Sequence, residues 1–106
     1  MSRKLQVILS ELRRRFEALY GPRLVRMVLY GSQARGDAEA GSDIDVLVVL
    51  RGPVEPFEEI RRTLDDVWQL SYEHEESIMC VFVSEEEYAR EQSPLLLNVR
   101  REGTPV

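Results

Sequence analysis

The sequence predicts a small α/β (α+β) fold in which helices back a mixed β-sheet. Segments with helical and strand periodicity follow one another in the order helix, strand, strand, helix, strand, helix. Residues 43–50, DIDVLVVL, are almost continuously apolar after their first positions, as is typical of a central strand covered on both faces. The length of 106 residues matches one domain, so we expect residues 1–106 to form a single folding unit.

The first helix is expected over residues 2–20. Ser2 is a suitable N-cap, and Gly21-Pro22 follows as a termination signal. Apolar side chains recur every three or four residues, so they should share one buried face. They are Leu5, Ile8, Leu9, Leu12, Phe16, Leu19 and Tyr20.

Two strands should follow this helix. Residues 24–30, LVRMVLY, are rich in β-branched and apolar side chains, and Gly31-Ser32 interrupts them. A short helical turn is expected at 32–36, followed by a loop of small and polar residues. The second strand is expected at 43–50.

The second long helix is expected over residues 56–72. Its apolar residues also recur at helical spacing, which predicts that Trp68 packs in the core with the other members of the stripe. These are Phe57, Ile60, Leu64, Val67 and Ser71.

The remaining elements are shorter. Residues 77–83 should form a third strand, and Ser84 with Glu87 makes a capping box that starts a short helix. A last helix should begin at Ser93-Pro94 and end at Gly103. Its three successive leucines, 95–97, cannot all face one core, so Leu97 is expected at the surface.

Composition excludes several classes of function. The net charge of −5 argues against general nucleic-acid binding, which depends on cationic groups meeting phosphates. The single cysteine, Cys80, excludes an internal disulfide and a cysteine-based zinc site, and the single histidine, His74, excludes a His-rich metal site. No apolar run is long enough to cross a membrane, and no secretory signal is present, so we expect a cytoplasmic protein.

Two aspartates begin the predicted central strand. Asp43 and Asp45 fall on one strand face, about 7 Å apart along the chain, while Ile44 points to the opposite face. Two neighbouring carboxylates require a compensating cation, and Mg²⁺ commonly binds one or two carboxylates together with substrate phosphate oxygens. Asp43 and Asp45 are therefore candidate metal ligands, for Mg²⁺ or Mn²⁺.

A Gly-Ser pair ends the preceding strand. Gly31 allows the backbone to approach a phosphate closely, and the free N–H groups of the following turn would point at the anion. The hydroxyl of Ser32 can donate as well. Arg35, one turn further, is positioned to reach a phosphate or to brace the loop.

These residues carry a resemblance to a known family. GSQARGDAEAGSDID (31–45) resembles the signature of the DNA polymerase beta-like nucleotidyltransferase superfamily, in which Gly-Ser is followed by ten residues and Asp-x-Asp. Residues 30–50 look like those of minimal nucleotidyltransferase (MNT) domains, and 81–88 and 93–103 are similar to the end of these proteins. The resemblance implies a nucleotidyltransferase fold, phosphate binding by Gly31 and Ser32, and Mg²⁺ binding by Asp43 and Asp45. It also implies ATP as substrate, with transfer of AMP.

The family pattern has a third acidic residue on the strand after the long helix, where it promotes deprotonation of the acceptor hydroxyl. Alignment of VFVS places Ser77 at that position. Glu76 is adjacent, and it could serve as the catalytic carboxylate if a bulge realigned the strand, since a shift of one residue reverses the side chain. Both assignments remain open at this stage.

The resemblance also implies a partner. MNT proteins are typically encoded beside a helical HEPN protein, a ribonuclease toxin, which they neutralise by adenylylating a tyrosine, by binding, or by both. We therefore expect an antitoxin that modifies such a partner. The alternative is an inactive module that masks the partner, and transfer to a small molecule is a third reading.

Overall fold

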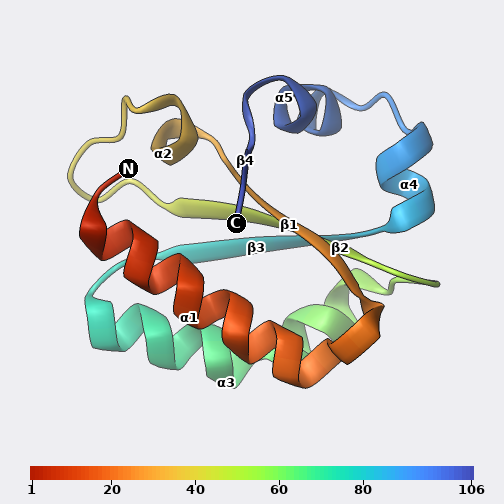
Figure 1. Cartoon of the computed structure of the whole chain (residues 1–106), viewed down its shortest axis with the longest axis horizontal. Coiled ribbons are helices and arrows are strands. Elements are labelled where there is room, and N and C mark those ends of the chain that lie inside the picture. Colours follow the sequence, from red (N-terminus) through yellow and green to blue (C-terminus); the bar gives the residue numbers. More distant parts are fainter.

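A computed structural model describes residues 1–106 as a four-stranded sheet between two layers of helices (Figure 1). The strand order is β3-β2-β1-β4. The strands are β1 (Leu24–Tyr30), β2 (Ile44–Leu50), β3 (Ile78–Ser84) and β4 (Thr104–Pro105). The helices are α1 (Arg3–Tyr20), the 3₁₀ turn η1 (Gly21–Arg23), α2 (Ser32–Arg35), α3 (Pro56–His74), α4 (Glu85–Arg90) and α5 (Pro94–Glu102). The expected α/β class with a mixed sheet is confirmed.

The central position of β2 follows from its pairings. It lies antiparallel to β1 and parallel to β3, and six of its seven residues are buried. A parallel pair needs a crossover, which α3 supplies between the two strands. The register sets Ile44 opposite Ile78 and Asp45 opposite Met79.

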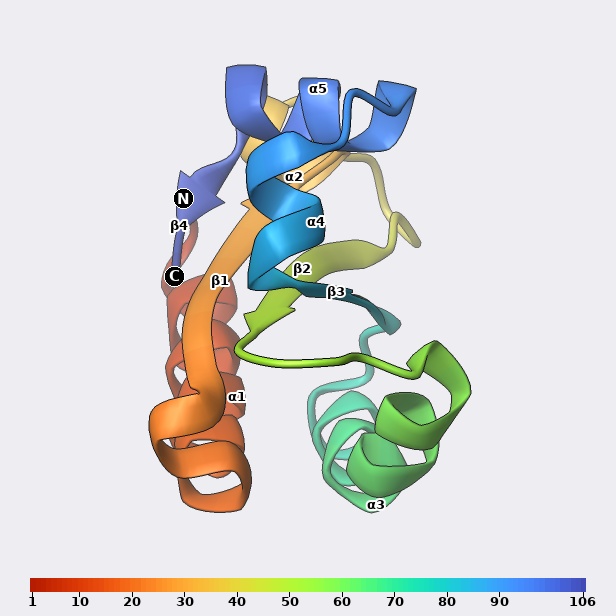
Figure 2. The ribbon, with the colours of Figure 1, turned by 90° about the vertical axis from the view of Figure 1, so that its right-hand side faces the viewer.

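The two faces of the sheet are covered differently. The helices α1 and α3 lie on one face, and α4 and α5 lie toward the other (Figure 2). On the α1 side, 15 buried residues form the main core, whereas six form a smaller core with α5. Alternation along β2 connects the two cores: Ile44, Val46 and Val48 face α1, and Leu47 and Val49 face α5.

Helix α1 has the expected amphipathic form. The hydroxyl of Ser2 accepts a hydrogen bond from Leu5 N at 3.1 Å, as an N-cap should. Six of the seven apolar residues on the expected stripe are buried, and Leu19 is the exception. No helix of the protein combines the length and the hydropathy required of a membrane span.

The expected packing of α3 is wrong. Its buried residues are Glu59, Thr63 and Leu70, while Trp68 is 62% exposed. Glu59 is accommodated because it accepts a hydrogen bond from the Tyr20 hydroxyl at 2.7 Å and pairs with Arg62 at 3.2 Å. Satisfied polar groups therefore occupy the inner face of this helix, and most of its apolar stripe faces outward.

The C-terminus contains a strand that sequence patterning missed. Thr104 and Pro105 pair with β1, and Val106 N donates to Met27 O at 3.0 Å. The chain passes so close to α5 and β1 at Gly103 that a side chain there would collide with Val28 and with the Val99 carbonyl. Two residues are too few to show strand periodicity. Within α5, Leu96 and Val99 are buried, and Leu97 is exposed as expected.

Candidate active site

The two aspartates lie where β2 begins, on the sheet face opposite α1. Ile44 is buried in the core beneath α1, so the neighbouring side chains at 43 and 45 point to the other face. Asp43 is exposed and Asp45 is half-buried. The arrangement that the sequence predicted for this pair is present.

The electrostatic environment of Asp45 is unfavourable for its charge. Burial raises the pKa of Asp45, the negative charge of Asp43 raises it further, and the charge of Arg35 opposes both effects. A divalent cation would relieve this repulsion, and carboxylate oxygens are the hard ligands that Mg²⁺ and Mn²⁺ prefer. The donor set therefore fits a metal ion.

Gly31 lies directly against Asp45. The register of β1 and β2 sets Tyr30 opposite Asp45, so the next residue passes over the carboxylate. A Cβ built on Gly31 would come 2.5 Å from Asp45 Oδ2, and its φ of +75° also favours glycine. The Gly-Ser pair and the two aspartates are therefore brought together.

The turn after Gly31 is the short helix α2. The carbonyl of Gly31 accepts hydrogen bonds from Ala34 N and Arg35 N, both at 3.1 Å. The carbonyl of Ser32 accepts from Gly36 N at 3.0 Å, which closes the helix. The first N–H groups of such a helix have no intrahelical acceptor, so those of Ser32 and Gln33 are available to a ligand.

Arg35 ties the turn to the C-terminal helix. Its guanidinium pairs with Asp37 and with Glu102, both at 3.2 Å. These bonds, that to Asp37 first, raise the pKa of Arg35. Arg35 therefore braces the loop, which is one of the two roles considered from the sequence. To contact a phosphate, Arg35 would have to break its ion pairs with Asp37 and Glu102.

The register identifies the residue beside Asp43 on the next strand. Ile44 N donates to Ser77 O at 2.8 Å, and Ile44 lies opposite Ile78, so Ser77 is level with Asp43 and Met79 with Asp45. Side chains at equivalent positions of paired strands point to the same face. Ser77 and the half-exposed Met79 therefore flank the aspartates, and no bulge interrupts the pairing at this end.

Glu76 lies on the other side of the sheet. Its carboxylate pairs with Lys4 of α1 at 3.1 Å, and it shares a small hollow with Ile8 and Ile44. The structure does not bring Glu76 together with Asp43 and Asp45. The realignment that would make it the third carboxylate is absent, because β2 and β3 pair in unbroken register from Ile44 onward.

Tyr30 is a neighbour of the site that sequence reasoning did not single out. It is half-buried at the end of β1. Burial raises the pKa of its phenol, and the charge of Asp45 adds to this shift. The sequence signal for Tyr30 is its position directly before the Gly-Ser pair that ends the first strand.

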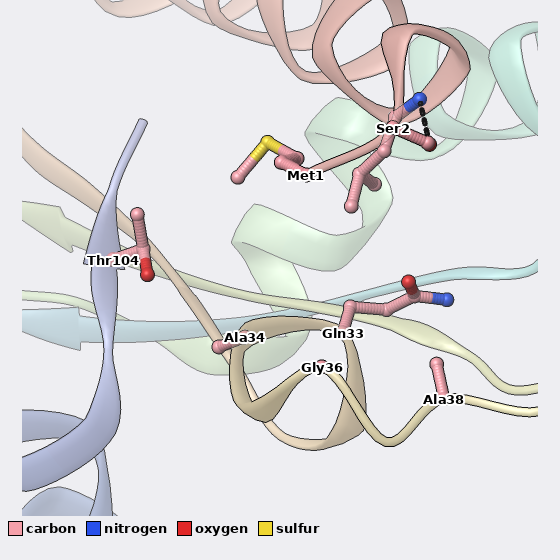
Figure 3. A pocket seen from close by; sticks show the side chains of 8 residues that line it. Met1, Ser2, Gln33, Ala34, Gly36, Ala38 and Thr104 are labelled. Atoms are coloured by element: carbon pink, nitrogen blue, oxygen red, sulfur yellow. Dashed lines mark hydrogen bonds between the residues drawn. The ribbon is translucent and has the colours of Figure 1, made fainter.

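A hollow of about 500 Å³ lies beside α2, between it and the start of α1 (Figure 3). No aspartate lines this hollow, so it is separate from the site described above. Its lining residues are Met1, Ser2, Leu5, Gln33, Ala34, Gly36, Ala38 and Thr104.

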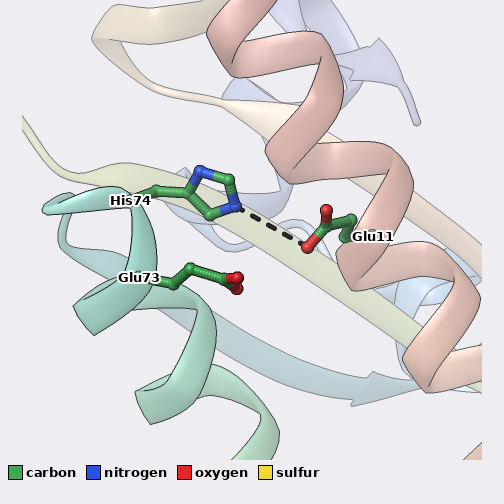
Figure 4. Close-up of side chains that lie close together, drawn as sticks. All are labelled: Glu11, Glu73 and His74. Atoms are coloured by element: carbon green, nitrogen blue, oxygen red, sulfur yellow. Dashed lines mark ion pairs between the residues drawn. The ribbon is translucent and has the colours of Figure 1, made fainter.

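The only histidine is also remote from the aspartates. His74 Nε2 lies 3.6 Å from Glu11 Oε2, and Glu73 is close by (Figure 4). This cluster joins α1 to the end of α3. The His74 side chain is 19% exposed. It cannot serve as a base at Asp43 and Asp45 from this position.

Fold and site together define the class of protein. A family model described as a nucleotidyltransferase domain matches residues 9–105, so the chain belongs to this family. None of the curated proteins matches the sequence.

Solved structures with this fold include a chain of a toxin–antitoxin complex with AMP-PNP. It has a TM-score of 0.65 and 17% identity, and the alignment covers 98% of this chain and 72% of that one. A candidate nucleotidyltransferase from Sulfolobus solfataricus has a TM-score of 0.60 and 19% identity, with 99% and 86% covered. A candidate minimal nucleotidyltransferase has a TM-score of 0.59 and 27% identity, with 96% and 95% covered.

Proposed function

We propose that this nucleotidyltransferase domain transfers AMP from ATP, with Mg²⁺, to a tyrosine hydroxyl of a helical HEPN-type toxin, and so acts as an antitoxin. One observation carries the proposal: Gly31 packs against the carboxylate of Asp45, which joins the two halves of the family signature. The likeness to a toxin–antitoxin structure with AMP-PNP supports the choice of nucleotide and partner.

Asp43 and Asp45 would hold the metal ion, which supplies charge neutralisation at the phosphates when bound. Gly31 and Ser32 would bind the phosphates, since a side chain at position 31 would fill the space above Asp45. The Ser32 hydroxyl and the first N–H groups of α2 are the donors on this side of the site.

The reaction forms a bond from the acceptor oxygen to the α-phosphorus and breaks the bond between that phosphorus and the oxygen bridging to the β-phosphate. Pyrophosphate leaves. The acceptor hydroxyl must also lose its proton, and a phenol has an ordinary pKa near about 10. Because Ser77 stands beside Asp43 and Glu76 faces α1, we propose that a group of the partner assists this step.

The transfer is tested with ATP labelled at the α-phosphate, Mg²⁺ and a HEPN-type protein, taken from the neighbouring reading frame where that frame encodes one. Mass spectrometry should find the partner heavier by whole AMP units, and Asp43→Asn should abolish the shift. Absence of any shift with either Mg²⁺ or Mn²⁺ would contradict the transfer.

Two glycines provide a matched test of the site itself. Gly31 and Gly36 both have positive φ, +75° and +84°, but only a Cβ at Gly31 would meet Asp45. Both alanine variants should lose about 1 kcal/mol of stability through backbone strain, and Gly31→Ala should lose more because its Cβ also meets Asp45. Only Gly31→Ala should lose ATP binding in calorimetry; equal losses from both variants would contradict the assignment.

The second candidate function is neutralisation by binding alone, which Ser77 favours because it replaces the third carboxylate. In that case the Asp43→Asn, Asp45→Asn double variant would still neutralise the toxin in a growth assay. Loss of neutralisation by a folded double variant would favour the enzyme.

A further inference from the structure

The outward face of α3 carries a continuous apolar line, here called the α3 stripe: Phe57, Ile60, Leu64, Trp68 and Tyr72. Their exposed fractions are 76%, 44%, 55%, 62% and 75%. Spacings of three and four residues align them over about 22 Å at the helical rise of about 1.5 Å per residue. The rings of Trp68 and Tyr72 stack, with centroids 5.3 Å apart.

The stripe borders a groove at the edge of the sheet. β3 is an edge strand, with β2 on one side only. A hollow of about 240 Å³ lies between α3 and β3, and seven of its eight lining residues are apolar. They are Ile60, Thr63, Leu64, Val67, Ile78, Met79, Cys80 and Phe82. A monomer rarely exposes an apolar surface of this extent.

A two-fold axis between Leu64 and Asp65 relates two pairs of positions on this face. Phe57 corresponds to Tyr72, and the exposed Arg61 corresponds to Trp68. An antiparallel copy of α3 would therefore set an aromatic ring against each terminal ring. It would set Arg61 against Trp68 of the second copy, which is a favourable cation–π pair. Leu64 would meet its own counterpart at the centre.

The exposed apolar side chains provide a large part of the area that such an interface needs. Three aromatic side chains exposed by 62–76% offer roughly 300–500 Å², on the basis of about 150–250 Å² for each buried ring. A standard interface buries about 800 Å² on each partner. The aromatic rings alone supply about half of this, and the exposed parts of Ile60 and Leu64 extend it.

We infer that the α3 stripe is the interface of a symmetric homodimer in which α3 packs antiparallel against α3 of a second copy. The interface lies on the α1–α3 side of the sheet, and Asp43 and Asp45 face the other side, so the dimer leaves them open. The inference does not depend on nucleotide transfer.

Sedimentation velocity over a range of protein concentrations tests the association. The wild-type chain should sediment as a dimer at micromolar concentrations. Leu64→Glu and Trp68→Glu should each weaken the dimer by roughly 30-fold or more, as expected at the centre of an interface. Leu97→Glu is the control, because Leu97 is an exposed leucine of α5, and it should remain a dimer. Circular dichroism confirms that each variant is folded.

Cross-linking tests the antiparallel arrangement. In a Cys80→Ser background, Leu64→Cys should oxidise to a disulfide-linked dimer, since its Cβ meets its own copy near the axis. Phe57→Cys alone should not, because two copies of position 57 would lie roughly 22 Å apart. Mixing the Phe57→Cys and Tyr72→Cys chains should produce the cross-linked heterodimer.

A chain that stays monomeric at high micromolar concentration overturns the inference. If the wild-type chain alone is monomeric and a folded Leu64→Glu variant no longer binds the HEPN-type protein, the inference is also wrong. The α3 stripe is then the binding surface for that partner. Neither result affects the test of AMP transfer, which depends on Asp43.

Discussion

The two faces of the sheet divide stability and chemistry between them. On the α1–α3 face, 15 residues form one buried cluster, and on the α5 face six do. The smaller core shares its face with Asp43 and Asp45, where burial and then the negative charge of Asp43 raise the pKa of Asp45. A strongly packed face can stabilise a fold that keeps an unfavourable charge pair on the other face, which is common where a site is built for a ligand.

The largest expected effect is on the packed face. Phe16→Ala should lower the free energy of unfolding by about 3–5 kcal/mol, because the ring is fully buried between α1 and the sheet. Leu19→Ala, on the same helix but 40% exposed, should lower it by about 1 kcal/mol or less. Urea unfolding measures both, and equal losses would contradict the division between the faces.

The buried carboxylate of α3 should come next. Glu59→Ala removes the partner of Tyr20, Arg23 and Arg62. We expect a loss of about 1–3 kcal/mol, since the Tyr20 hydroxyl is left unsatisfied. Glu58→Ala, at a half-exposed position one residue earlier, should change stability by less than about 0.5 kcal/mol. A neutral result for Glu59→Ala would show that this network contributes no stability.

The same network should make the stability of the protein depend on pH in the alkaline range. Burial, with the hydrogen bond to Glu59, raises the pKa of Tyr20 well above its usual range. Because the folded state holds this proton more tightly, its contribution to stability is complete below pH about 10 and is lost as the pH rises above that. Unfolding measured from pH 8 to 11 should therefore show a smaller alkaline loss for Tyr20→Phe than for the wild type.

The smallest effect on stability should be at the aspartates, with the opposite sign. The raised pKa of Asp45 means that its charge disfavours folding at neutral pH. Asp45→Asn should therefore raise the melting temperature slightly without metal. The wild type should be stabilised by ATP with Mg²⁺ and not by ATP in EDTA, whereas Asp45→Asn should respond to neither. An equal ATP affinity with and without metal would contradict the assigned ligands.

Sequence patterns were sufficient where the physical cause was local. Alternation along 43–50 sets Asp43 and Asp45 on one face, and the capping groups of Ser2 and Ser84 begin helices where they were expected. The nearness of Gly31 to Asp45 follows from two adjacent antiparallel strands joined by a loop. Steric alternation and hydrogen bonding within a few residues decide the strand face and the helix caps, and the pairing of two neighbouring strands adds the Gly31–Asp45 contact.

Tertiary contacts decided the rest. Helices α1 and α3 have similar apolar periodicity, but α3 buries Glu59 and Thr63 because Tyr20 of α1 and Arg23 of η1 bond to the Glu59 carboxylate from outside α3. No pattern within α3 contains this information. Glu76 and Ser77 were equally possible from the sequence until the register of β2 and β3 separated them onto opposite faces. β4 exists because β1 has a free edge at which two residues after Gly103 can pair. In these cases residues close in sequence determined the local geometry, and contacts with residues distant in sequence determined which side chains were buried and which strands paired.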